Sequence, residues 1–190
     1  MVNKSNSNAP DRRVKSTVAI LFVIVLLGSS AFLALGGPTG IAARPGLFGT
    51  KANLFTDINL IAQIVLLLGL GAGAIFARQG NIALHQYNQT GWVLLNIVLT
   101  IFIMIVAYVE YVAPGLPGNL RQAYGILPTI HAALGLLAIF CGVYLILRMN
   151  QWIPKKWRIK WWKNLMRLTL ILYWLVGIFG LAIYYVWFMR

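Results

Sequence analysis

Three ionisable side chains, Asp57, Glu110 and His131, lie inside long apolar segments of this 190-residue sequence. An ionisable group at membrane depth is costly, so it counts as a functional-site hypothesis wherever its segment crosses a bilayer. Imidazole and carboxylate groups at one depth could relay protons, bind a quinone headgroup or ligate a metal. The first question is therefore whether these segments span a membrane.

The composition and the segment lengths predict that they do. The chain is 60% hydrophobic and 10% charged, and a spanning helix needs about 20 mainly apolar residues. The strand-like alternation of a membrane barrel is absent. We therefore expect an all-α, polytopic membrane helical bundle with five transmembrane helices, in which a basic inner tail at 1–16 precedes a single domain at 17–190. The expected spans are 17–36, 53–77, 91–113, 126–147 and 168–188.

The distribution of basic residues predicts the orientation. If the N-terminus is inside, twelve of the 16 Lys and Arg residues lie in inner segments, as the positive-inside rule requires. Because topology explains the net charge of +13, we expect no nucleic-acid partner. The first span is too long for the usual signal-peptide core, so we expect it to be uncleaved. The predicted location is the bacterial inner (cytoplasmic) membrane, with the C-terminus outside.

The inner segment 148–167 alternates tryptophan with basic residues. Aromatic rings favour the headgroup level, and each Lys or Arg near an anionic leaflet contributes about 1 kcal/mol of attraction. We interpret this segment as an interfacial anchor for membrane lipids, including anionic lipids, rather than an RNA-binding patch. The anchoring residues are Trp152, Lys155, Lys156, Trp157, Arg158, Lys160, Trp161, Trp162 and Lys163.

The three ionisable residues have similar predicted depths in the membrane. At about 1.5 Å per residue, Asp57, Glu110 and His131 all lie roughly 5 to 8 Å below the outer boundary, which predicts an outer-side polar cluster. Its role stays open between ligand or proton chemistry and helix-to-helix hydrogen bonding. Further polar residues at membrane depth are Asn59, Gln63, Asn96 and Thr100.

His131 is the candidate ligand for a cofactor, either haem b or a quinone, and any bound metal stays unknown. His85 lies near the opposite boundary, about 24 Å away at 1.5 Å per residue, so the two imidazoles cannot share one iron. We expect His85 to be solvated or to face lipid, because it occurs in the polar stretch RQGNIALHQYNQTG.

Small and polar residues recur at helical spacing in the last two spans. Such stripes allow close helix packing in lipid, so we expect them to face one another. The glycines of GLGAG, at 69–73, should serve packing as well, because no strand precedes them to form a phosphate-binding loop. The two stripes are His131, Gly135, Ala138 and Gly142, and Tyr173, Gly177, Gly180 and Tyr184.

Three stretches carry a resemblance to a known family. They are TDINLIAQIVLLLGLGAGAIFARQGNIALHQ, LPTIHAALGLLAIFCGVYLILR and LMRLTLILYWLVGIFGLAIYYVW. They resemble the small uncharacterised bacterial membrane family that includes the CtaM/YozB-like proteins, over about residues 55–187. The polar landmarks are Asp57, Asn59, Gln63, Arg78, His85, His131, Arg167, Trp174 and Gly177.

The resemblance implies a four-helix core and an association with the maturation of aa3-type cytochrome oxidase. This chain departs from the family at two places: Gln86 follows His85 where basic residues are usual, and Glu110 stands near the place of a second histidine. We therefore expect a non-catalytic accessory or assembly subunit of a respiratory or photosynthetic electron-transport complex, with other membrane subunits as partners. The alternative is a haem- or quinone-binding electron-transfer subunit with His131 as ligand.

Overall fold

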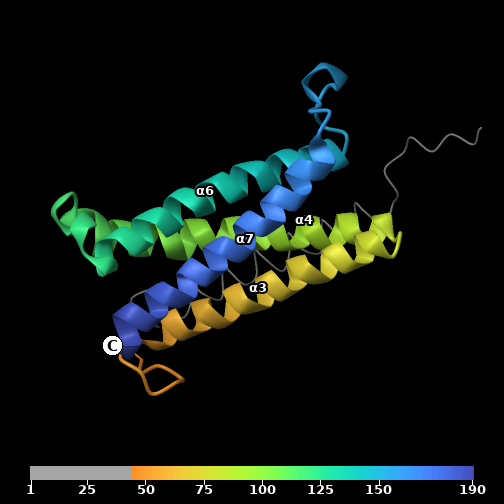
Figure 1. Cartoon of the computed structure of the whole chain (residues 1–190). Helices are drawn as coiled ribbons and strands as arrows, with labels where there is room; N and C mark the ends of the chain where they lie inside the picture. The colour runs from red at the N-terminus through yellow and green to blue at the C-terminus, as the bar shows by residue number, and fades with distance from the viewer. Residues whose placement is uncertain (1–43) are drawn as a thin grey trace, which may run out of the picture.

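The computed structural model describes residues 44–190 (Figure 1). The expected tail at 1–16 and the expected first span at 17–36 lie outside the described residues. Within residues 44–190, four helices are long and apolar enough to cross a membrane, which fits an integral membrane protein. They extend over Leu54–Arg78, Ile82–Gly115, Ala123–Met149 and Trp162–Met189.

Each of these spans is one helix or a helix with a distorted end. The first is α3 (Leu54–Arg78), and the third is α6 (Ala123–Met149). The second begins as α4 (Ile82–Leu99), and the fourth is α7 (Trp162–Tyr184) followed by the π-helical turn η6 (Tyr185–Met189). Beyond α4 the second span passes through η1 (Thr100–Met104), α5 (Ile105–Ala107), η2 (Tyr108–Val112) and η3 (Ala113–Gly115).

Two helices begin before the predicted membrane spans, because the polar residues there are also helical. The second described span begins at Ile82 rather than 91. Asn81 caps this helix start by accepting a hydrogen bond from Leu84 N at 3.1 Å. The last begins at Trp162 rather than 168. The basic connection is therefore residues 150–161, with η5 (Lys155–Trp157) inside it, and not the whole predicted segment 148–167.

The four helices form a ring in which each packs against two neighbours. α3 contacts α4 and α7, and α6 likewise contacts α4 and α7. Figure 1 shows the last turns of α7 beside the start of α3, with the 150–161 connection at the other end. We refer below to the C-terminal end, which carries loop 44–53 and η6, and to the basic end, which carries residues 150–161.

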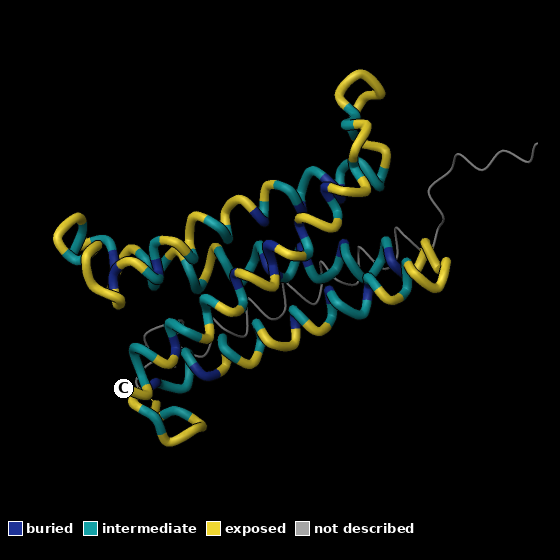
Figure 2. The backbone as a smooth tube through the Cα atoms, in the orientation of Figure 1, coloured by how far each residue is buried: buried dark blue, intermediate teal, exposed yellow. Residues whose placement is uncertain are grey.

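The buried core is small (Figure 2), and the residues exposed around it include many large apolar side chains. Leu66 and Leu70 of α3 pack with Val93 of α4, Ala138 of α6 and Tyr173 of α7 in the core. Large apolar side chains such as Leu68, Phe140 and Ile171 are exposed on the outside. Exposed apolar surface on this scale is unfavourable in water, whereas the hydrocarbon of a bilayer solvates it.

A polar seam joins α3 to α4. Asn88 donates to Gly69 O at 2.7 Å, and Gln89 donates to Leu70 O at 3.0 Å. The ring of Trp92 lies where a β-carbon on Gly69 would be, so this position has room only for glycine. A β-carbon on Gly73 would likewise meet Asn88 and Gln89, so two of the three GLGAG glycines serve helix packing, as the sequence predicts.

The α6–α7 interface uses most of the two predicted stripes. Gly180 faces the His131 ring, and a β-carbon on Gly142 would lie 2.9 Å from Tyr173 Oη. Gly177 differs, because it faces Leu67 of α3 rather than α6. The small residues allow backbones to approach closely where the hydrophobic effect contributes little to association.

The Gly69 contact can be tested with a matched glycine on the same helix. A β-carbon on Gly71 would meet nothing closer than Trp174 Cζ2 at 3.7 Å. We expect Gly69→Ala to lower stability by about 1 to 3 kcal/mol through overpacking. Gly71→Ala should be neutral or slightly stabilising because alanine favours a helix by up to about 1 kcal/mol. Thermal unfolding in detergent compares the two variants, and equal shifts would contradict the described seam.

Candidate functional site

Asp57 is a fully buried carboxylate at the C-terminal end of the bundle. It lies in the first turn of α3, and its exposed fraction is 0%. Its Oδ2 accepts hydrogen bonds from Leu47 N at 2.6 Å and Phe48 N at 3.1 Å. Its Oδ1 accepts one from Tyr184 Oη at 2.6 Å. We call these four residues the Asp57 clasp.

The loop that supplies the two amides is shaped for this contact. Pro45 pairs with Asn53 in an antiparallel bridge, and Leu54 N donates to Arg44 O at 3.1 Å. A β-carbon on Gly46 would lie 2.6 Å from Asp57 Oδ2. Glycine at this position therefore lets the loop close over the carboxylate.

Thr50 extends the clasp to a second hydroxyl. Thr50 Oγ1 lies 3.0 Å from Tyr184 Oη. Because Tyr184 gives its proton to the carboxylate, the Thr50 hydroxyl is the donor in this contact. Ala52 N in turn donates to Thr50 Oγ1 at 3.2 Å. Loop, α3 and α7 are thus joined through one connected network.

The surroundings of the Asp57 carboxylate are electropositive. Three hydrogen-bond donors point at its oxygens, and successive backbone amides form an anion-binding concavity. The position in the first turn of α3 also places the negative charge at the positive end of the helix dipole. The groups around Asp57 therefore favour a structural carboxylate that fixes the end of the bundle.

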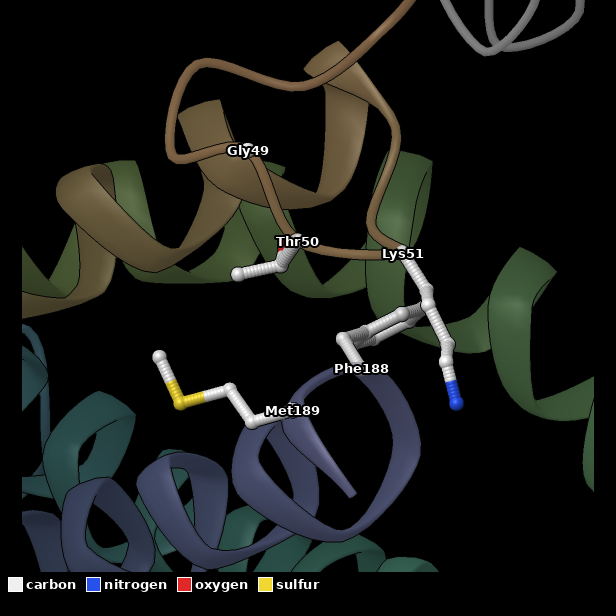
Figure 3. Close-up of a pocket in the computed structure, with 5 residues that line it drawn as sticks. All are labelled: Gly49, Thr50, Lys51, Phe188 and Met189. Atoms are coloured by element: carbon white, nitrogen blue, oxygen red, sulfur yellow. The ribbon is translucent and has the colours of Figure 1, made fainter.

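An opening lies next to the clasp, between the loop and the last turn of the chain. Figure 3 shows it between Thr50 and Lys51 on one side and Phe188 and Met189 on the other. Lys51 N donates to Phe188 O at 3.2 Å, and Lys51 Nζ to Arg190 O at 3.3 Å. The polar side-chain groups of the lining are one ammonium, from Lys51, and one hydroxyl, from Thr50. Both already bond across the contact between the loop and the end of the chain, so we assign the opening to that contact.

His131 bridges α6 and α7. Its Nδ1 lies 3.1 Å from Val176 O, and because a carbonyl oxygen only accepts, Nδ1 carries the proton. Nε2 is consequently the nitrogen with a lone pair. Metal-ligating histidines commonly use this arrangement, but the same contact also serves as a bond between two helices.

Glu110 differs from the other two residues, because its side chain is exposed. It lies in η2, on the second described span, and its neighbours Val109 and Tyr111 are 57% and 65% exposed. The predicted cluster of Asp57, Glu110 and His131 is therefore not assembled within the described chain. No group of three His, Cys, Asp or Glu residues within 44–190 could hold a metal ion.

The other polar residues predicted at membrane depth have separate surroundings. Asn96 is buried on α4, and Thr100 donates weakly to Met104 Sδ at 3.8 Å. Asn59 Oδ1 and Gln63 Nε2 are buried on α3 and have no hydrogen-bond partner among the described residues. Within residues 44–190, no hydrogen bond links these four residues to His131, whose partner is Val176 O.

The expectation that His85 is solvated or faces lipid was wrong. Only 5% of its surface is exposed, and its Nδ1 lies 2.7 Å from Gly73 O on α3. Nε2 is buried and has no partner within residues 44–190. Most of the stretch that we expected to be a polar loop, residues 82–91, is helical in α4, and its histidine turns toward α3.

Sequence reasoning also missed the donors of the clasp. The amides of Leu47 and Phe48 carry no sequence signal, and Tyr184 stood out as a packing residue alone. The Gly and Pro residues of the loop before Asp57, and the acid in the first helical turn, were the available signals.

No protein-family description matches this chain, and neither a curated protein nor a solved structure gives a significant match.

The clasp predicts a difference between two adjacent tyrosines. Tyr184→Phe removes the donor to Asp57 Oδ1 and should lower stability by about 1 to 3 kcal/mol, because a buried acceptor loses its partner. Trypsin should then cleave the loop faster after Lys51. Tyr185→Phe is the matched control, since Tyr185 is 59% exposed. Indistinguishable melting and cleavage of the two variants would contradict the clasp.

Proposed function

We propose that this protein is a non-catalytic accessory or assembly subunit of a membrane electron-transport complex. It would lie in the bacterial inner membrane with its C-terminal end outside. The observation that carries the proposal is the exposed carboxylate of Glu110 on the side of a spanning helix. Such a group calls for a partner beyond residues 44–190, and we propose that a neighbouring subunit provides it.

The depth of Glu110 makes its exposure unusual. It precedes the end of its span at Gly115 by five residues, or roughly 8 Å at 1.5 Å per residue. Acidic residues in spanning segments are rare, and they usually face the bundle interior and pair with other groups. A Lys or Arg from a neighbouring subunit would satisfy Glu110 at this depth.

The backbone around Glu110 supports a docking role. The second span contains two π-helical turns, η1 (Thr100–Met104) and η2 (Tyr108–Val112), and Glu110 lies in the second. Single π-turns inside helices are rare and are frequently found at functional sites. The exposed aromatic Tyr111 beside Glu110 adds a side chain suited to an interface.

The electron-transport part of the proposal is supported by the sequence resemblance. The landmark residues Asp57 and His131 hold loop and helices together in this fold, which suits a scaffold whose surface binds partners. The resemblance to the CtaM/YozB-like proteins favours an oxidase or related redox complex as the partner.

Photo-crosslinking tests the docking face directly. A photoreactive phenylalanine analogue in place of Tyr111 should form a discrete adduct with one membrane protein, and mass spectrometry should identify a redox-complex subunit. Glu110→Gln in the same chain should reduce the adduct about tenfold, because a buried charge-assisted pair contributes about 1.5 to 3 kcal/mol. The measurement is the adduct yield in native membranes.

The control for this experiment is an equally exposed position on another helix. Leu68 on α3 is 61% exposed, and the analogue placed there should give no discrete protein adduct. The same adduct from both positions, or an adduct unaffected by Glu110→Gln, would contradict docking through Glu110. A discrete partner that belongs to no redox complex would overturn the electron-transport part alone.

The second candidate function is a haem- or quinone-binding electron-transfer subunit with His131 as ligand. The observation in its favour is the proton on His131 Nδ1, which leaves Nε2 with a lone pair. When bound, haem would supply one-electron chemistry through an imidazole ligand. Val176 O would fix the orientation of the ring.

A reduced-minus-oxidised absorption spectrum distinguishes the two functions. The haem form of the second candidate predicts a haem band that His131→Ala abolishes while His85→Ala leaves it in place. The first predicts no band in the isolated chain, or a band that follows a partner and persists in His131→Ala. A pulldown quantified beside the spectrum shows which protein carries the pigment.

A further inference from the structure

The basic end of the bundle carries positive charge without a nearby acid from residues 44–190. Within residues 44–190 the acidic side chains are Asp57 and Glu110, and both lie toward the C-terminal end. The third acid of the chain, Asp11, is a single charge. The counter-charge for most of these cations must therefore come from outside the protein. The cations between 148 and 167 are Arg148, Lys155, Lys156, Arg158, Lys160, Lys163 and Arg167.

The connection that carries many of them is held against α6. Tyr144 donates to Trp157 O at 3.1 Å and accepts from Ile159 N at 2.8 Å. Arg158 Nε donates to Ile153 O at 3.0 Å, which closes the connection further. The basic end therefore presents an ordered arrangement of cations rather than a freely moving chain.

Two of the cations share one indole ring. The guanidinium carbon of Arg148, at the end of α6, lies 5.1 Å from the centre of the Trp162 ring. The ammonium of Lys163 lies 5.9 Å from the same ring. Cation–π attraction holds each charge near the indole, but the two positive charges repel one another. An anion between them would remove this repulsion.

The same place has unused hydrogen-bond donors. Arg148 Nη1 is buried and has no acceptor among the described residues. The N-cap residue of α7, Trp161, provides no side-chain hydrogen bond to the helix start, and the first turn of α7 has no acid. A buried guanidinium nitrogen without an acceptor is costly. A phosphate oxygen is the acceptor whose charge and geometry suit it.

We propose that Arg148, Trp162 and Lys163 form a binding site for the phosphate group of one anionic phospholipid. α6 ends at Met149 and α7 begins at Trp162, so the site lies where two spanning helices leave the hydrocarbon and lipid phosphates begin. The Trp152 and Trp157 side chains, 72% and 69% exposed, sit in the same layer, which tryptophan favours. This site is independent of the docking face at Glu110.

Native mass spectrometry of the full chain in detergent tests the site. Phosphatidylglycerol is titrated as the probe. Phosphatidylcholine, whose headgroup is zwitterionic with no net charge, is the comparison, and inorganic phosphate is the competitor. Arg148→Gln should weaken the first phosphatidylglycerol-binding step about tenfold or more, because it removes charge-assisted hydrogen bonds. Lys163→Gln should weaken it by a smaller factor. Lys156→Gln, which removes one exposed charge elsewhere in the connection, should change it less than about threefold.

The titrations distinguish a specific lipid site from diffuse attraction. A tight first phosphatidylglycerol, resistant to equimolar phosphate and lost in Arg148→Gln but not in Lys156→Gln, supports the site. Equal weakening by Arg148→Gln and Lys156→Gln would show diffuse attraction and overturn it. Equal binding of phosphatidylcholine, or displacement by equimolar phosphate, would overturn it as well. Circular dichroism of each variant shows whether a loss of lipid binding comes from a loss of folding. Trp162→Phe is included as a mild substitution of the ring.

Discussion

The described fold depends on how the carboxylate of Asp57 is satisfied. A fully buried carboxylate is tolerated only where donors replace its water. Leu47 and Phe48 provide backbone donors from the loop, and Tyr184 provides a hydroxyl from the last helix. Satisfying one charge therefore positions the loop, the start of α3 and the end of α7 together. Residues 127 positions apart become neighbours through a single side chain.

The two ends of the bundle differ in the charged side chains that they hold: the acidic side chains of residues 44–190 lie toward the C-terminal end, and the cluster of basic side chains lies at the basic end. At the C-terminal end one acid, Asp57, is enclosed by donors, whereas the other acid, Glu110, is exposed on the side of a span. At the basic end the cations lack acids within residues 44–190, and Arg148 keeps a buried nitrogen without an acceptor. We propose that a neighbouring subunit pairs with Glu110 and that a lipid phosphate pairs with Arg148.

The sequence predicts the helical membrane class and most of the helix packing, because apolar length and stripes of small residues are local patterns. It places α3 and α6 within a few residues of their ends. It fails where polar residues continue a helix, as with His85, since hydropathy cannot distinguish a polar loop from a polar helix face. Asp57, Glu110 and His131 have similar predicted depths but do not come together. Depth fixes only the position of a residue along the membrane normal, whereas helix packing decides which way its side chain faces. The donors of the clasp are backbone amides, which no side-chain pattern reveals.

The most direct test of the account is the composition of the particle that contains this chain. The full chain, at its natural expression level, would be extracted with its surrounding lipids in polymer discs and weighed by native mass spectrometry. The account predicts one chain associated in fixed ratio with a redox-complex subunit, and a shift to the lone chain in Glu110→Gln. A particle that contains only this chain and lipid, unchanged by Glu110→Gln, would contradict an accessory or assembly role.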